Sequence, residues 1–425
     1  MAPSPKVAEA IARAEGSSAA DKAPLYESLL GDIKTLSSPA TAADDLEAVT
    51  DSLFGQSLGV VSTRAVLAVL VGTLEALRDG DLCIAVGRHA LSRLAAQPSS
   101  FADAAADLGA LVAAAHEAND DFAEAARALA AIPLDGAAHQ RKVGDADRAR
   151  VWIRIVRNYL EVGDSPAAET YLNKLKNMMH TVSADDDPDL ALHFKLSQAR
   201  IQDAKRDFLA AAGRYHDISF APAIAEEERL HTLAMAIKCA ILAPAGPTRS
   251  RALARLYKDD RAPQLPEFAM LEKMFLDRLL APDEVASFAR ALQPHQLATT
   301  SDGSTVLAKA VVEHNLLGAS RLYDNIRFDA LGALLGLDPD KAEQTTARMI
   351  EQGRLVGRMD QLDGIVWFEG GEASGENGSG HARESVGKQI RKWDANVESL
   401  AQQVEQVTNS LQKEFPDFVA THLAV

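Results

Sequence analysis

The chain has 425 residues, of which 47% are hydrophobic and 24% are charged, a composition typical of folded domains with ample core. Its formal net charge of −16 argues against binding to nucleic acid or to anionic membranes and favours either solubility or basic protein partners. The two cysteines, Cys83 and Cys239, form neither a metal-ligand spacing nor a disulfide framework, so we expect an intracellular protein.

The N-terminal segment, residues 1–22, is rich in alanine, serine and proline and carries charges throughout. It lacks the apolar stretch of a signal peptide, and we expect it to be disordered. The most apolar run, residues 65–74, is too short to span a bilayer, so it predicts a buried helix and no membrane contact.

Residues 23–293 show helical periodicity in nearly every segment, with prolines and glycines between the segments. Four sets of residues recur at a spacing of 43 residues: Asp121, Asp164 and Asp207; Ala125, Ala168 and Ala211; Leu129, Leu172 and Tyr215; and Leu108, Val151 and Phe194. A looser copy begins at Asp81. Such periods are typical of solenoids whose stacked helix pairs expose a long surface for partners. The sequence therefore predicts a mostly α-helical fold with a right-handed paired-helix solenoid of the TPR or HEAT type.

A polar, turn-rich segment at residues 294–304 follows the last predicted solenoid helix. It is either a plain flexible loop or, as we predict, a contact loop. The residues expected to make the contacts are Thr299, Thr300, Asp302 and Gly303.

Residues 305–369 predict a winged helix, that is, three helices followed by a two-stranded wing. The first helix spans residues 305–317, with Gly318 as its cap, and His314 lies on its apolar face as a packed or hydrogen-bonded core residue. The second helix stops at Gly336, and the third begins at Asp338. Two β-rich runs, 354–360 and 365–369, are joined through an Asp-Gly turn and predict the hairpin.

A winged helix can bind DNA, and the charges of this one argue against it. The third helix, where DNA would be read, mixes two basic residues with three acidic ones: Lys341, Arg348, Asp340, Glu343 and Glu351. Phosphate contacts dominate nucleic-acid affinity, and no basic stripe is present to make them. We expect the module to pair with proteins through the edge of its wing.

The C-terminal part consists of a low-complexity linker, residues 370–382, and a predicted helix, residues 383–414, which Pro416 ends. Apolar residues of this helix alternate at spacings of four and three: Val386, Ile390, Trp393, Val397, Leu400, Val404, Val407 and Leu411. This is the seam of a coiled coil, which a lone helix cannot bury against itself. The helix must dock on other helices, in this chain or in another.

No catalytic or metal-binding arrangement is found. The pair His116-Glu117 lacks a second histidine at the zinc-protease spacing, and no P-loop or nucleophile elbow is present. The acidic run at residues 185–187 lacks the alternating carboxylates of a calcium loop and predicts a helix cap instead. The sequence favours an interaction scaffold without enzymatic activity or cofactors.

The order of solenoid, winged helix and terminal helix resembles the PCI family, which supplies scaffold subunits to the proteasome lid, the COP9 signalosome and a translation initiation factor. The strings that carry the resemblance are Pro-His-Gln at 294–296, Ala-Thr-Thr-Ser-Asp-Gly-Ser at 298–304, Glu-His-Asn-Leu-Leu at 313–317, Arg-Leu-Tyr-Asp-Asn-Ile at 321–326 and Asp-Gln-Leu-Asp-Gly-Ile-Val at 360–366. They are most similar to the signalosome branch of the family. The resemblance is good over residues 151–369 and weaker before them.

The resemblance implies a non-catalytic subunit of a complex that removes the ubiquitin-like protein NEDD8 from cullins, in the cytoplasm and nucleus. Its implied partners are other PCI subunits, the MPN subunits and the cullin–RING ligase. In the family, winged helices line up edge to edge, terminal helices join one bundle, and the loop before the winged helix lies near the MPN subunits. The expected interface residues on the winged helix are Asp324, Asn325, Arg354, Val356, Arg358 and Ile365.

Two features depart from the family pattern. The linker after the wing is longer than expected, and Arg327 stands where a small hydroxyl cap is expected, which points to Asn325 as the cap of the second helix. Three other functions stay open: a paralogous scaffold of the proteasome lid, a winged-helix nucleic-acid binder, and an enzyme whose residues cannot be named.

Overall fold

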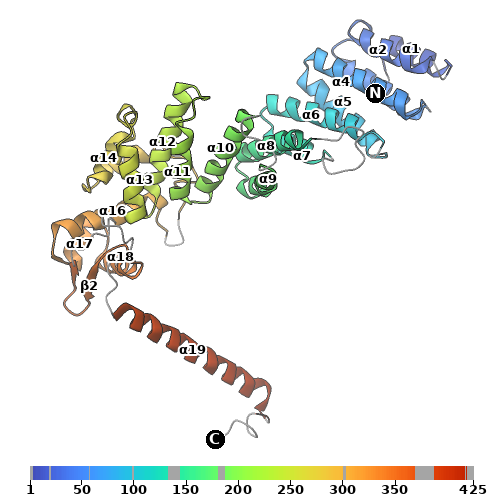
Figure 1. The fold of residues 1–425 in the computed structure, drawn as a ribbon. Helices are drawn as coiled ribbons and strands as arrows, with labels where there is room; N and C mark the ends of the chain where they lie inside the picture. The colour runs from blue at the N-terminus through green and yellow to red at the C-terminus, as the bar shows by residue number, and fades with distance from the viewer. Residues whose placement is uncertain are drawn as a thin grey trace. The chain divides into compact units, whose positions relative to one another are not determined.

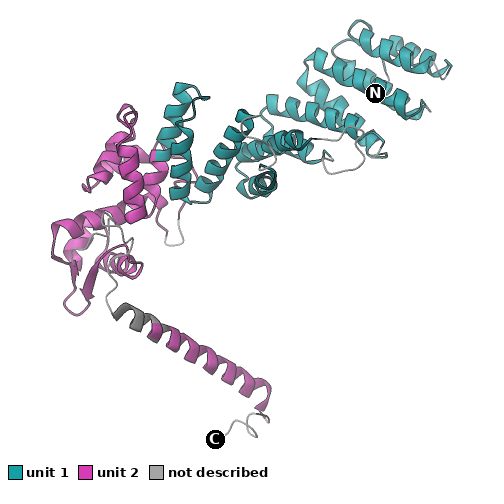
Figure 2. Cartoon of the chain, viewed as in Figure 1, with its two compact units in different colours: residues 1–236 teal, residues 237–425 magenta. Residues whose placement is uncertain are grey.

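The computed structural model describes residues 3–18, 21–56, 58–97, 100–132, 144–179, 187–299, 303–368, 387–416 and 418. The fold is mostly helical, as Figure 1 shows. The chain divides into two compact units, Met1–Ala236 and Ile237–Val425, drawn in teal and magenta in Figure 2. The division falls inside one helix, α12, whereas the sequence suggested a change of domain near residue 293.

Unit 1 is a stack of helices in which each packs on its neighbours along the chain, such as α6 on α7, α8 on α9 and α10 on α11. The predicted paired-helix solenoid is confirmed. Its helices are α1 (Pro5–Glu15), α2 (Lys22–Leu36), α3 (Ala42–Gly55), α4 (Val60–Leu77), α5 (Gly80–Leu94), α6 (Ala102–Ala118), α7 (Phe122–Ala130), α8 (Asp145–Val162), α9 (Ser165–Met178), α10 (Pro188–Ala204), α11 (Phe208–Ile218) and the first part of α12 (Glu226–Leu242).

The 43-residue period belongs to a turn between paired helices. A left-handed residue ends the first helix of each pair: Asp120 (φ 59°), Gly163 (φ 84°) and Arg206 (φ 65°). The aspartate that follows each of them is the N-cap of the second helix. Four residues further on, the alanines of the repeat are completely buried. The period is therefore set by a chain reversal and by a close helix contact that only a small side chain permits.

The looser copy begins earlier than predicted. Arg78 is left-handed (φ 53°), and Asp79 is the cap, accepting a hydrogen bond from the backbone N–H of Leu82 at 3.2 Å. Asp81, the predicted start, lies inside α5. Asp187 does cap α10, because its carboxylate accepts from the backbone N–H of Leu190 at 3.1 Å.

The N-terminal segment is not disordered where the structure describes it. Helix α1 buries Val7 and Ala14, and the backbone N–H of Ser4 donates to Asp45 at 2.6 Å. Burial opposes ionisation of the Asp45 carboxyl, but hydrogen bonds from Ser37 and Ser4 lower its pKa below the usual value. The prediction of disorder was wrong because an alanine-rich segment can be helical once a neighbouring core covers one face.

Helix α4 contains the most apolar run and is longer than that run, at 18 residues. By length and composition alone it could cross a membrane, but one such helix is weak evidence. It packs on α2 and α6 and buries Val66, Leu67, Leu70 and Leu74. These contacts are those of a core helix in the solenoid.

Unit 2 contains the end of α12, further short helices and the winged helix. Its elements are α13 (Pro247–Tyr257), the 3-10 helix η1 (Ala262–Gln264), α14 (Phe268–Phe275), α15 (Pro282–Ala289), α16 (Val306–Leu322), β1 (Asn325–Arg327), α17 (Phe328–Leu335), α18 (Pro339–Glu351), β2 (Gly357–Asp360), β3 (Ile365–Phe368) and α19 (Gly387–Glu414). The strands form one antiparallel sheet in the order β1-β3-β2. The predicted winged helix is confirmed, with one strand, β1, that the sequence analysis missed.

Gly318 does not end the first helix of the winged helix. Helix α16 continues to Leu322, so Gly318 lies inside its last third. A Cβ atom at Gly318 would stand 3.2 Å from the carbonyl oxygen of Asp277 and 3.4 Å from Leu279. The glycine therefore permits a close approach between segments and has no role as a cap.

Two other boundaries differ from the predictions. Strand β2 begins at Gly357, because the backbone N–H groups of Arg354 and Leu355 both donate to Met349 and close the end of α18. Arg327 itself is the N-cap of α17, while Asn325, the predicted cap, lies in β1. The N–H of Phe328, at the first position of α17, donates to the carbonyl oxygen of Gly364 at 2.9 Å.

Candidate assembly site

The strand order decides which predicted interface residues lie on an edge. Strands β1 and β2 form the edges and β3 the centre, so Ile365 lies on the central strand. Arg358 is exposed on β2, while Val356 precedes that strand. Asp324 and Asn325 are exposed at the other edge. The predicted set is therefore divided between the two edges and the centre of the sheet, except that Val356 and Arg354 both precede β2. Arg354 is largely buried, in an ion pair with Glu313.

Part of the predicted contact loop lies outside the described residues, namely Thr300 and Asp302. The ends of the loop are held together by an isolated bridge between Thr299 and Thr305. Gly303 is left-handed, with φ 75°. The Thr305 hydroxyl accepts from the backbone N–H of Ala308 at 3.1 Å and so caps α16. The loop is thus joined directly to the start of the winged helix.

The seam of α19 is exposed in the chain. The side chains of Trp393, Leu400 and Val407 are 67%, 60% and 59% exposed. Val397 and Val404 are exposed as well, and Leu411 is partly exposed. Val386 and the side chain of Ile390 lie outside the described residues. Apolar side chains spaced in this way, with nothing of the described chain covering them, favour docking on other helices.

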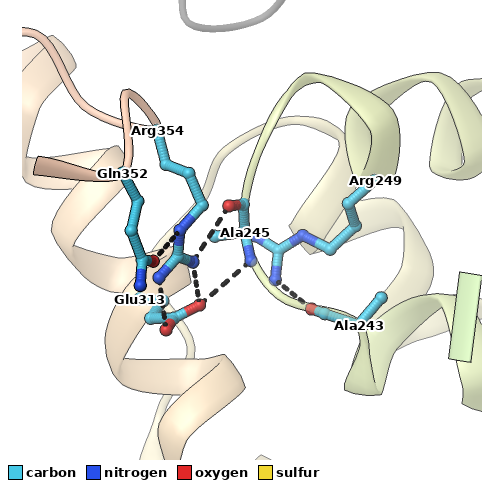
Figure 3. Close-up of polar contacts among 6 residues, drawn as sticks. All are labelled: Ala243, Ala245, Arg249, Glu313, Gln352 and Arg354. Atoms are coloured by element: carbon cyan, nitrogen blue, oxygen red, sulfur yellow. Dashed lines mark hydrogen bonds and ion pairs between the residues drawn. The ribbon is translucent and has the colours of Figure 1, made fainter. Parts of the chain in front are cut away.

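A buried ion pair joins the winged helix to the corner between α12 and α13 (Figure 3). Glu313 on α16 is 2% exposed, and its oxygens accept from Nη1 and Nη2 of Arg354 at 2.5 and 3.0 Å. The carboxylate also accepts from the backbone N–H of Ala245 at 3.0 Å. Arg354 in turn donates to the carbonyl oxygen of Ala245 at 3.1 Å. The backbone of Ala245 is therefore hydrogen-bonded to both partners of the ion pair.

A second arginine lies beside this ion pair. Arg249 on α13 is 2% exposed and donates from Nη1 to the carbonyl oxygen of Ala243 at 3.3 Å (Figure 3). Burial lowers the pKa of Arg249 to about 10, and the carboxylates of Glu313 and Asp277 partly offset the effect. Glu313 thus compensates positive charge from two elements that are far apart in the sequence.

The next two residues of α16 face another segment. His314 Nε2 lies 2.8 Å from the carbonyl oxygen of Arg278, which can only accept, so Nε2 carries the proton. Burial, followed by the charge of Arg249, lowers the pKa of His314 to about 4, so the imidazole is neutral. Asn315 accepts from the backbone N–H of Leu280 at 2.9 Å. The prediction of a hydrogen-bonded core histidine is confirmed.

We call the four residues Glu313, His314, Asn315 and Arg354 the junction cluster. Of these residues, only the core role of His314 was predicted from the sequence. Glu313 and Asn315 were named only for the resemblance, and Arg354 was predicted to lie at an interface. The available signal was three consecutive polar residues on a helix whose flanking residues, Val312 and Leu316, are apolar. Among the described residues, no group of three or more His, Cys, Asp or Glu side chains could hold a metal ion.

Two protein families match the chain. Residues 8–227 match the family described as PSMD12/CSN4, N-terminal, and residues 272–369 match the PCI domain. The COP9 signalosome complex subunit 4 of Neurospora crassa is 55% identical over 98% of both chains. The protein of that name from Emericella nidulans is 46% identical over 96% of this chain and 98% of the relative. That from Drosophila melanogaster is 34% identical over 94% and 92%. Identity at this level over nearly the whole length, together with the solenoid and winged helix, shows that the chain belongs to the COP9 signalosome subunit 4 family of PCI-domain proteins.

Proposed function

We propose that this chain is a non-catalytic scaffold subunit of the COP9 signalosome, a complex that removes NEDD8 from cullin–RING ubiquitin ligases. The observation that carries the proposal is the exposed seam of α19, in a chain that aligns over 98% of its length with a relative named for that complex. A large apolar side chain contributes about 1.5–3 kcal/mol when it is fully buried. Several such residues on one helix face therefore favour association with other helices.

Two elements serve assembly in this proposal. Helix α19 joins a bundle with helices of other subunits, and the edge strand β2 pairs with a neighbouring PCI subunit. Backbone groups on the free side of an edge strand need a partner, and the short, charged β2 avoids non-specific pairing. The solenoid provides a long surface, to which we assign contact with the cullin–RING ligase.

The loop at residues 299–304 relays this contact to the metalloprotease subunit. It is polar, and the bridge between Thr299 and Thr305 anchors it to the start of α16. A displacement of the winged helix would therefore move the loop. In this reading the protein works in the cytoplasm and nucleus, where its cullin partners are modified.

Affinity purification of the tagged full chain, followed by mass spectrometry, tests membership of the complex. We expect the other signalosome subunits in near-equal amounts, whereas recovery of proteasome-lid subunits instead would contradict the proposal. Deleting residues 300–302 should leave this recovery intact and change the rate of NEDD8 removal from a neddylated cullin. An unchanged rate would exclude the relay and leave the scaffold role standing.

A further inference from the structure

One face of the three-stranded sheet points away from the core of the winged helix. Ile326, Val366 and Phe368 are buried on the core side. Because side chains alternate along a strand, their neighbours project to the other face. The strand register places Asn325, Trp367 and Arg358 in one row across that face, and Arg327, Ile365 and Asp360 in the next. We call these six residues the open sheet face.

Two arginines on this face have no acidic partner in the part of the chain that the structure describes. Among the residues that the structure describes, neither Arg327 nor Arg358 forms an ion pair, although the chain as a whole has a net charge of −16. Both are exposed, and the guanidinium of Arg358 lies 5.2 Å from the ring centroid of Trp367. A cation held over an aromatic ring is oriented in advance for a carboxylate.

The one acidic residue of the face is already engaged. Oδ1 of Asp360 accepts from the backbone N–H groups of Leu362 and Asp363, at 3.0 and 3.3 Å, and so closes the turn of the wing. It is therefore poorly placed to neutralise the arginines. Tryptophan and arginine are also the residue types that most often dominate the energy of protein interfaces.

We propose that the open sheet face binds an amphipathic helix of a neighbouring protein subunit, through two carboxylates that flank an apolar residue. The inference deepens the proposed scaffold function and rests on it. A sheet face offers only side chains, whereas an added strand would need the backbone groups of an edge. A helix supplies side chains alone, and its apolar residue covers Trp367 and Ile365 while its carboxylates meet the arginines.

The spacing of the arginines sets the spacing of the carboxylates. Arg327 and Arg358 lie on the outer strands and in successive rows, so their Cα atoms are about 10 Å apart across the sheet and about 7 Å along it. The diagonal is about 12 Å. Two turns of an α-helix advance about 11 Å. The partner helix therefore carries its two carboxylates seven or eight residues apart.

A single-stranded nucleic acid could also stack on a tryptophan beside arginines. The surroundings argue against it, because Asp360 and Asp363 on the wing and Asp324 next to β1 border the sheet, and their carboxylates would repel phosphates. We therefore assign the face to a protein helix and leave nucleic acid as an outcome of the test.

Zero-length cross-linking in the reconstituted signalosome tests this assignment. The variants Arg327→Lys and Arg358→Lys each place a primary amine on the face, and a carbodiimide joins an amine to a carboxylate only where the two are in contact. We expect both amines to link to Asp or Glu residues of the same helix of another subunit, seven or eight positions apart. Gln344→Lys, at an exposed position on α18, is the matched control and should give no link to that helix.

A charge-reversal variant makes the test quantitative. The R327E/R358E variant should recover about tenfold less of the subunit to which the two lysine variants cross-link. The circular dichroism spectrum of the isolated chain should stay unchanged. Full recovery of that neighbour, or links formed only within the chain or between two copies of it, would overturn the inference. So would arginine-dependent binding of a fluorescent oligouridine. If the wild-type chain does not enter the complex at all, the scaffold function itself fails, whereas assembly without these links defeats this inference alone.

Discussion

Replacing Arg354 by methionine should destabilise unit 2 strongly, because the substitution isolates a buried charge. Glu313 is 2% exposed and would keep only one of its three hydrogen bonds, the one from the backbone N–H of Ala245. Removing one partner of a buried ion pair costs about 3–5 kcal/mol, and the nearby charge of Arg249 puts the cost here at the lower end, about 3 kcal/mol. Arg354→Met should therefore lower the free energy of unfolding of unit 2 by that amount.

A second substitution should restore part of the loss. Glu313→Gln in the Arg354→Met background removes the charge, and the side-chain carbonyl can still accept from Ala245. We expect the double variant to be about 1 kcal/mol more stable than the single variant. The penalty of a buried unpaired carboxylate exceeds that of a buried amide, and the loss of the Glu313 charge beside Arg249 offsets part of this gain. Lys341→Met is the control: it removes an exposed ion pair with Asp338, 3.8 Å apart, which is worth at most about 1 kcal/mol.

Hydrogen exchange measured by mass spectrometry suits this test, because it reports on each segment of a chain with two compact units. Exchange in α16 and at the start of β2 should accelerate in Arg354→Met and slow again in the double variant. If Arg354→Met costs no more than Lys341→Met, or if the added Glu313→Gln makes the chain less stable, the buried ion pair does not stabilise unit 2 in this way.

Three further predictions concern other elements. Leu400→Asp should leave the isolated chain folded, as judged by gel filtration, and prevent its entry into the signalosome. In the complex, a charge in the seam of α19 would have to be buried without a partner. Normal entry of the variant would mean that α19 is a solvated tail. Gly163→Ala should lower the free energy of unfolding by about 1–2 kcal/mol, because a φ of 84° disfavours a residue with a Cβ atom. Gly213 lies inside α11 with free space around it, so Gly213→Ala should raise the free energy of unfolding by about 0.5–1 kcal/mol. Thermal unfolding measures both. The pKa of Asp45 is lowered in the folded chain, so its ionised carboxylate stabilises the fold at pH values above the ordinary pKa of aspartate. This stabilisation is lost as the pH falls through the lowered pKa. Protection of α1 from exchange should therefore decline at acid pH in the wild type and be weak and pH-independent in Asp45→Ala.

Much of the fold could be predicted because its signals are local. The aspartates of the repeat cap helices, and the alanines fill close helix contacts, so both recur with the period of the unit. The turns of the winged helix were predictable for the same reason: Gly336, Gly353 and Gly364 all adopt positive φ, at 67°, 68° and 64°. Each of these residues acts within a few positions of itself.

The errors arose where a residue acts at a distance. Gly318 looked like a cap, and only its contact with Asp277 shows why glycine is needed there. Strand β1 has three residues and becomes a strand only by pairing with β3. Glu313 and Arg354 are 41 residues apart in the sequence, and no local pattern joins them. The predicted interface residues were separated for a related reason, because the strand order cannot be read from a hairpin alone.

The junction cluster also determines which fragments of the protein can fold by themselves. Successive residues of an α-helix point about 100° apart, so three consecutive buried polar side chains require cover over more than half of the circumference of α16. That cover comes from the corner at Ala245 and from the segment around Arg278 and Leu280. Ala245 also belongs to the same apolar core as Leu316 and Val366. A fragment that begins at the domain boundary suggested by the sequence, near residue 294, would expose that core and leave Glu313 and His314 without their backbone partners. A fragment that retains these contacts must begin before Ala245, so protein engineers who want the winged helix alone have to take the preceding helices with it.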